Sequence, residues 1–138
     1  MAIKLKHIGV KFTILEKASK LGGTWWDNQY PGAACDVASH LYSLSYYLNP
    51  FWSRAYSRQE EIRTYLQDLA NKYGLLPYIH FDTRVDKIEW NEFTAKWTVT
   101  TTTGKTYVVN LVYSGSGALH VPNETRFKGK NHIQIQPK

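Results

Sequence analysis

The side chains with the most chemistry to offer lie in one stretch, residues 21 to 36, which reads Leu-Gly-Gly-Thr-Trp-Trp-Asp-Asn-Gln-Tyr-Pro-Gly-Ala-Ala-Cys-Asp. The stretch combines two glycine turns, two tryptophans, a Tyr-Pro-Gly corner and the carboxylate of Asp36. Connecting loops longer than about 12 to 15 residues are usually either functional or disordered, and this stretch is too aromatic to be disordered. We therefore expect something to be bound or buried there.

A second carboxylate, Glu16, ends the apolar run of residues 12 to 15. This run is β-branched and aromatic, which predicts a buried strand of a parallel sheet. Residues 1 to 9 are predicted to be the tail of a helix that Gly9 closes. A helix leading into a strand with an acidic end is the second half of a βαβ unit, and in dinucleotide-binding units that acidic residue accepts hydrogen bonds from the adenosine ribose. A solvated glutamate at a strand end is the alternative.

Residues 58 to 73 carry the clearest helix pattern in the chain. Ser57 and Glu60 predict a capping box at its start, and Gly74 supplies its end. Apolar residues at steps of three and four should form one buried face, made of Ile62, Tyr65, Leu66, Leu69 and Tyr73. The aromatic-rich residues 39 to 52 are expected to cover the core as an irregular lid.

From residue 79 onward the apolar pattern changes to a period of two. Four strands are predicted, at residues 79 to 81, 84 to 90, 96 to 101 and 107 to 112. The last three should form an antiparallel meander, with a twist or bulge where the alternation breaks among Val85, Ile88 and Trp90. The small residues Ser-Gly-Ser-Gly at 114 to 117 would let the backbone approach something flat or charged.

The composition limits the classes of protein. The chain has 138 residues, a net charge of +6 and one cysteine. No apolar run is long enough to span a bilayer and the N-terminus has no signal-peptide pattern, so a cytoplasmic protein is predicted. Cys35 cannot form an intrachain disulfide and is interpreted as a small buried residue. The histidines show no metal-ligand spacing, so no metal site is predicted.

A basic, aromatic-rich chain raises the question of nucleic acid, because basic grooves with stacking aromatics bind single strands. Here the basic residues gather toward the two ends of the chain, whereas the aromatic residues lie mostly between them. This separation argues against nucleic acid as a partner. One candidate function is nevertheless kept as an alternative: the chain would be a small non-catalytic module that binds a planar ligand or single-stranded nucleic acid.

Several motifs in sequence order resemble the FAD-binding region of the class B flavoprotein monooxygenases, closest to the Baeyer-Villiger type, with the flavin-containing monooxygenases as relatives. The resemblance begins with Phe-Thr-Ile-Leu-Glu-Lys at residues 12 to 17, Leu-Gly-Gly-Thr-Trp at 21 to 25 and Asn-x-Tyr-Pro-Gly-Ala-x-Cys-Asp at 28 to 36. It continues with Tyr42-Ser, Gln59-x-Glu-Ile, Phe81-x-Thr-Arg-Val, Trp97-Thr-Val and Gly115-Ser-Gly-Ala-Leu-x-x-Pro. It covers residues 2 to 125.

The resemblance implies an α/β fold that binds FAD. Glu16 would bind the adenosine ribose, and Val85 would hold the adenine through its backbone. Asp36 and Tyr42 would lie by the isoalloxazine, and Asp36, the candidate catalytic residue, would position an arginine of an NADPH-binding domain. The backbone would pass close to the pyrophosphate and ribityl chain at Gly22, Gly23, Thr24 and Trp25, and close to the cofactor again at Gly117.

The sequence also departs from the family's pattern. The 138 residues contain neither the strand and Gly-x-Gly-x-x-Gly phosphate loop nor an NADPH-binding domain, and Phe127, Gly129 and His132 do not satisfy the family's Phe-x-Gly-x-x-x-His-x-x-x-Trp fingerprint. We therefore expect a fragment: a partial Rossmann-like FAD-binding domain at residues 1–119, with the antiparallel meander inserted at 84–112 and a loosely ordered tail at 120–138.

The family's reaction is implied by the same resemblance. The full-length enzyme would use FAD and NADPH to insert one oxygen atom from O2 beside a ketone, or to add it to a heteroatom such as a sulfide. The flavin would perform this chemistry, while the protein positions it and excludes water. The chain alone is expected to be inactive.

Overall fold

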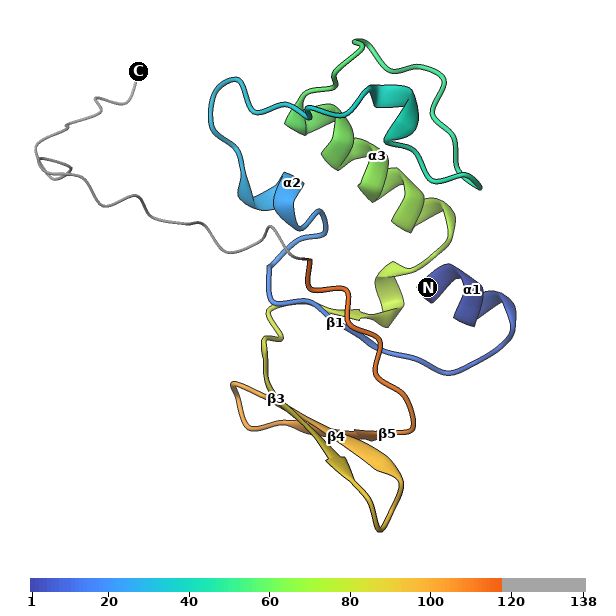
Figure 1. Ribbon diagram of the computed structural model, residues 1–138, viewed down its shortest axis with the longest axis vertical. Helices are drawn as coiled ribbons and strands as arrows, with labels where there is room; N and C mark the ends of the chain where they lie inside the picture. The colour runs from blue at the N-terminus through green and yellow to red at the C-terminus, as the bar shows by residue number, and fades with distance from the viewer. Residues whose placement is uncertain (118–138) are drawn as a thin grey trace, which may run out of the picture.

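The structure of the protein, a computed structural model, describes residues 1–117 (Figure 1). A helical part that contains α2 (Thr24–Asp27) and α3 (Gln59–Lys72) lies at one end of the molecule, and a three-stranded sheet lies at the other. A short parallel strand pair lies between them. The predicted tail and the last two residues of the predicted domain lie outside the described residues, so that division of the chain stays a prediction.

The first helix, α1 (Ala2–His7), is closed by Gly9, two residues after its last helical residue, as predicted. Gly9 has a φ of 71°, and its amide donates to the carbonyl of Lys6 at 3.1 Å. The next amide, that of Val10, donates to the carbonyl of Leu5 at 3.0 Å. These two bonds form the Schellman motif, in which a glycine takes the left-handed conformation that ends a helix.

The predicted strand at residues 12 to 15 is shorter and more exposed than expected. β1 (Ile14–Leu15) has two half-buried residues and pairs in parallel with β2 (Ile79–His80), Ile14 opposite Ile79 and Leu15 opposite His80. The parallel pairing is confirmed. The expectation of a buried strand is wrong, because within residues 1–117 the sheet has only these two strands and a strand needs neighbours and covered faces to be buried.

The core of the helical part is built on α3. Ile62, Tyr65 and Leu69 of the predicted face are buried, and Ile62 is fully so. The helix ends at Gly74 as predicted, with a φ of 57° and a second Schellman pair of hydrogen bonds. The side chain of Lys6 crosses from α1 and donates to the carbonyls of Tyr73 and Gly74 at 2.7 and 2.9 Å.

The predicted capping box at the start of α3 is wrong. The N-cap residue is Arg58, and no side chain forms a capping hydrogen bond there. Ser57 is instead buried with its hydroxyl 2.6 Å from that of Ser39. The sequence pattern is local, whereas the partner that takes the Ser57 hydroxyl comes from 18 residues earlier in the chain.

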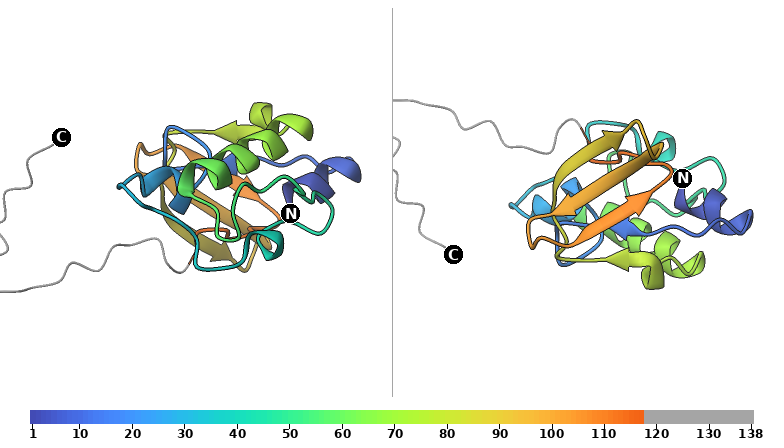
Figure 2. Two further views of the ribbon diagram at one scale, coloured as in Figure 1. Left: turned by 90° about the horizontal axis from the view of Figure 1, so that it is seen from above. Right: turned by 90° about the horizontal axis from the view of Figure 1, so that it is seen from below.

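The meander forms with the predicted strand order. β3 (Val85–Asn91), β4 (Lys96–Thr101) and β5 (Thr106–Val109) pair antiparallel in sequence order, and the expected irregularity appears as a register shift between Val85 and Lys87. The last strand starts one residue earlier and ends three earlier than predicted. Figure 2 shows the three strands side by side, on the opposite side of the molecule from α3.

The connecting segments hold little regular structure. Residues 39 to 52 contain the single turn η1 (Ser39–Leu41) and an isolated bridge between Leu44 and Tyr47, which agrees with an irregular lid. A second turn, η2 (Leu76–Tyr78), leads into β2. Among residues 1–117 no helix is long and apolar enough to cross a bilayer.

Candidate flavin site

The glycine pair of the 21 to 36 stretch forms a tight turn into a short helix that the sequence did not predict. Gly22 has a φ of 141° and Gly23, the N-cap of α2, has a φ of 51°. A Cβ on Gly22 would lie 3.0 Å from the Cβ of Trp26 and 3.2 Å from its amide nitrogen. Both the backbone conformation and the close contact therefore require glycine at position 22.

The structure brings two of the predicted site residues into contact. The Trp25 indole donates from Nε1 to the hydroxyl of Tyr42 at 2.8 Å, and the two rings meet edge to face with centroids 5.8 Å apart. Both side chains are half-buried. This pair joins α2 to the lid, so the ring of Trp25 has a defined orientation.

Asp36 is placed by backbone pairing with the segment that precedes α3. The amide of Cys35 donates to the carbonyl of Ser57 at 2.9 Å, and the amide of Gln59 donates to the carbonyl of Ala33 at 2.9 Å. Cys35 is buried, as expected for a small structural residue, and Asp36 directly after it is exposed. These two backbone hydrogen bonds hold the segment in place, so the carboxylate of Asp36 lies at the surface on a fixed backbone.

Two buried serines support this segment; sequence reasoning missed Ser39 and gave Ser57 a different role, in a capping box. Ser39 and Ser57 are each 1% exposed. The Ser39 hydroxyl donates toward the carbonyls of Arg54 and Ala55, at 2.7 and 3.0 Å. A hydroxyl carries one proton, so Ser57 must donate to Ser39. Serines are ordinary loop residues in sequence, and nothing in their spacing distinguishes this pair.

Glu16 and Val85 lie toward the same end of the parallel strand pair. The carbonyl of Glu16 accepts from the amide of Thr83 at 2.8 Å, and the carbonyl of Ala18 accepts from the amide of Asp82 at 3.1 Å. Val85 follows two residues later as the first residue of β3. The half-buried Glu16 carboxylate accepts from the amide of Ala18 at 2.8 Å, which orients it.

The remaining predicted residues are more loosely placed. Thr24 is exposed on α2, and Gly117 is exposed with a φ of 74°. A Cβ on Gly23 or Gly117 would meet nothing within 4 Å, so the space beside both backbones is open. An open groove of about 620 Å³ lies elsewhere, between residues 47 to 53 and the outer side of α3, and none of the predicted site residues lines it.

Histidine, cysteine and carboxylate side chains do not gather into a metal-binding cluster of three or more anywhere in residues 1–117. The described residues do provide a parallel strand pair with an acidic end, a glycine turn into a short helix, and the contact between the ring of Trp25 on that helix and the ring of Tyr42. An acidic residue at the end of a parallel strand and glycines that open the backbone to a ligand are features of dinucleotide-binding α/β proteins.

Sequence comparison identifies the relatives of this chain. It is 44% identical over 122 residues to a Baeyer-Villiger monooxygenase of Streptomyces coelicolor, a match that covers 88% of this chain and 23% of that protein. It is 42% identical over 135 residues to a Baeyer-Villiger monooxygenase of Pseudomonas aeruginosa, covering 97% and 26%. No protein-family model matches the chain.

Solved structures agree with these relatives. A steroid monooxygenase bound to NADP superposes with a TM-score of 0.84 at 34% identity, covering 94% of this chain and 26% of that one. An open form of cyclohexanone monooxygenase gives the same score at 32% identity and the same coverage. The chain belongs to the family of Baeyer-Villiger and related FAD-binding monooxygenases. It spans about a quarter of the length of the relatives it matches.

Proposed function

We propose that this chain binds FAD as part of an FAD- and NADPH-dependent monooxygenase of the Baeyer-Villiger type. The observation that carries the proposal is the match along 97% of the chain, at 42% identity, to a Baeyer-Villiger monooxygenase. The fold supports the same proposal, since a solved relative bound to NADP superposes over 94% of the chain.

The described residues fit FAD in two groups. Glu16 and Val85, toward one end of the parallel pair, would take the adenosine, with the carboxylate on the ribose. The open backbone at Gly23 and at Gly117 leaves room for close approach of the cofactor, because no atom occupies the space where a Cβ would lie. Gly22 and Thr24 would border the pyrophosphate and ribityl chain in the same turn.

The second group would face the isoalloxazine. The hydrogen bond from Trp25 to Tyr42 holds the two rings in one geometry, and the backbone pairing of Cys35 holds the exposed carboxylate of Asp36. When bound, FAD would supply the redox and oxygen chemistry. The chain's own residues would bind the cofactor, orient its ring and keep water from one side of it, while Asp36 would orient a cationic group beside the flavin.

The reaction we propose for the whole protein inserts one oxygen atom from O2 into a ketone, or adds it to a heteroatom, with NADPH as the reductant. A ketone is favoured because one structural relative is a cyclohexanone monooxygenase with ε-caprolactone bound. We also propose that the chain is a fragment of the whole protein and that it lacks the family's phosphate loop. The 138 residues alone are expected not to oxidise NADPH when FAD is supplied.

A titration of the purified chain with FAD, followed by quenching of flavin fluorescence, tests the proposal. The substitution Glu16→Gln should weaken binding by about ten- to a hundredfold, since a hydrogen bond to a charged group contributes roughly 1.5 to 3 kcal/mol. Glu92→Gln, an exposed residue in the β3–β4 turn, is the matched control and should bind FAD as the unchanged chain does. Salt-sensitive binding of a single-stranded oligonucleotide without FAD binding would favour the non-catalytic module instead.

A further inference from the structure

Three carbonyls of the short helix α2, those of Thr24, Trp25 and Trp26, accept hydrogen bonds from side chains. A helix leaves its last four carbonyls without intrahelical partners, and α2 has only four residues. The carbonyl of Thr24 accepts from the backbone and side chain of Asn28, and that of Trp26 accepts from Gln29 at 2.7 Å. Both of these partners are local and belong to the same turn.

The carbonyl of Trp25 has a partner of a different kind. It accepts a hydrogen bond from Nε2 of Gln59, which lies 34 residues further along the chain at the start of α3. Gln59 is 5% exposed, so the bond is sheltered from water. One turn later on α3, the guanidinium of Arg63 lies 5.8 Å from the ring of Trp26. Of the three carbonyl contacts, only that of Gln59 fastens the turn to the rest of the fold.

The same residue also anchors the far end of the 21 to 36 stretch. The amide of Gln59 donates to the carbonyl of Ala33, beside the bond from Cys35 to Ser57 that places Asp36. Gln59 therefore touches the stretch twice, through its side chain at Trp25 and through its backbone at Ala33. A change of its side chain alone would release the first contact and keep the second.

We propose that Gln59 is a positioning residue for the candidate flavin site: its buried carboxamide donates to the Trp25 carbonyl and presets the 22 to 27 turn. The role in FAD binding rests on the function proposed above. Gln59 would act through Trp25 without contacting the cofactor. Without the donor, the carbonyl of Trp25 would be left unsatisfied in a sheltered place. The turn would then be held to the rest of the fold only through the side chains of Trp25 and Trp26.

Three variants of the full chain test the proposal. Gln59→Met keeps the length of the side chain and removes the donor, Gln59→Glu replaces the donor by an acceptor at neutral pH, and Gln67→Met makes the matched change elsewhere on α3, where the side chain is half-exposed. Without FAD, amide hydrogen exchange at residues 24 to 28 should speed up about tenfold in both Gln59 variants, since an unsatisfied buried group costs roughly 1 to 3 kcal/mol. Gln67→Met should leave this exchange unchanged.

Titration with FAD gives the second measurement. Both Gln59 variants should bind FAD about tenfold more weakly than the unchanged chain. Burial beside a carbonyl oxygen disfavours the ionised form, so the carboxyl introduced by Gln59→Glu should have a pKa raised above its ordinary value. A protonated carboxyl can donate, so lowering the pH from about 8 to about 5 should restore the affinity of Gln59→Glu toward that of the unchanged chain at the same pH, while Gln59→Met should show no recovery. A residue with a merely structural role would not give this difference in pH profile.

The outcomes separate the two proposals. If the unchanged chain does not bind FAD but exchange at residues 24 to 28 rises in the Gln59 variants, the proposed function fails and the positioning of the turn stands. If the unchanged chain binds FAD and Gln59→Met, still folded by circular dichroism, matches it in affinity and in exchange, the positioning role is overturned. A Gln59→Glu profile parallel to that of Gln59→Met would also overturn it.

Discussion

Glycine is required at position 22 for two independent reasons. Its φ of 141° lies outside the range that side chains tolerate, and the Cβ it lacks would press on Trp26 from 3.0 Å. The neighbouring Gly23 also has a positive φ, but the space beside it is open. The two glycines therefore serve different purposes: the first permits packing inside the protein, and the second leaves room outside it.

Gly22→Ala should destabilise the chain by about 2 to 4 kcal/mol, because backbone strain of about 1 to 3 kcal/mol and a steric clash with Trp26 add together. Denaturant unfolding followed by tryptophan fluorescence measures this loss. Gly104→Ala, at a φ of 82° with nothing near the added Cβ, is the control for strain alone and should cost about 1 kcal/mol. Equal losses in the two variants would contradict the packing role of Gly22.

The pair formed by Trp25 and Tyr42 gives a second prediction at this scale. Tyr42→Phe removes the acceptor of the Trp25 indole and should cost about 1 kcal/mol of stability, the usual contribution of one hydrogen bond. The fluorescence emission of Trp25 should shift at the same time, since its ring loses a fixed partner. Tyr56→Phe, at an exposed tyrosine, is the control. An unchanged unfolding midpoint and spectrum in Tyr42→Phe would show that the bond is not formed in solution.

At the scale of elements, α3 is the framework on which the candidate site is assembled. Its buried face packs the core, its first residue fastens both the α2 turn and the segment before Asp36, and its end is held by Lys6 of α1. A positive charge at a helix C-terminus is favourable, because it lies near the negative end of the helix dipole. The part of the site around Trp25 and Asp36 therefore depends on the stability of this one helix.

Ile62→Ala tests that dependence. Ile62 is fully buried on α3, and removing its side chain should cost about 2 to 5 kcal/mol through lost burial and a new cavity. Circular dichroism during thermal unfolding measures the change. Thr100→Ala, on β4 of the meander, is the comparison and should cost less because its side chain is half-exposed. If both variants unfold at the same temperature, α3 is not the stabilising element.

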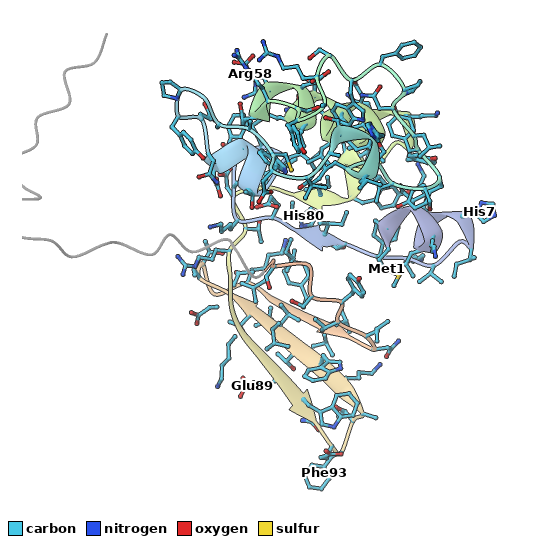
Figure 3. The ribbon with its side chains drawn as sticks, turned by 45° about the horizontal axis from the view of Figure 1, so that its top comes forward. Met1, His7, Arg58, His80, Glu89 and Phe93 are labelled. Atoms are coloured by element: carbon cyan, nitrogen blue, oxygen red, sulfur yellow. The ribbon has the colours of Figure 1, made fainter. Side chains whose placement is uncertain are left out.

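At the scale of the whole molecule, the described part of the chain has more exposed large hydrophobic residues than buried hydrophobic residues. Nine hydrophobic residues form the buried core, whereas 18 large hydrophobic side chains are at least 39% exposed. They include Phe93, which projects from the tip of the β3–β4 hairpin (Figure 3). Both strands of the parallel pair also have an unpaired edge within residues 1–117. Such patches and edges favour association with other chains.

We expect the chain to associate with itself in a concentration-dependent way, and the double variant Phe93→Ser, Val108→Thr to reduce this. Both side chains are exposed, at 102% and 64%, so neither change should lower the stability of the fold. Sedimentation velocity over a range of concentrations measures the association. Thr103→Ser, in the β4–β5 turn, serves as the control. A wild-type chain that stays monomeric at every concentration would contradict the prediction.

The sequence by itself determined the features that local chemistry sets. The helix end at Gly9, the course of α3 to Gly74, the meander and its bulge near Val85 all follow from glycine conformations and from apolar periods of 3.6 and two. Several motifs in sequence order, between residues 12 and 122, also indicated the monooxygenase family, which the comparisons confirm.

Only the tertiary structure decided which distant groups meet. Ser57 and Ser39 pair across 18 residues and displace the predicted capping box, and Gln59 reaches Trp25 across 34. The exposure of β1 likewise depends on how many strands lie beside it, which its own residues cannot encode. A pattern in sequence reports what a residue can do locally. Which hydrogen-bond partner a buried polar group takes is decided when the chain folds, because the cost of leaving it unpaired is the same whichever segment supplies the partner.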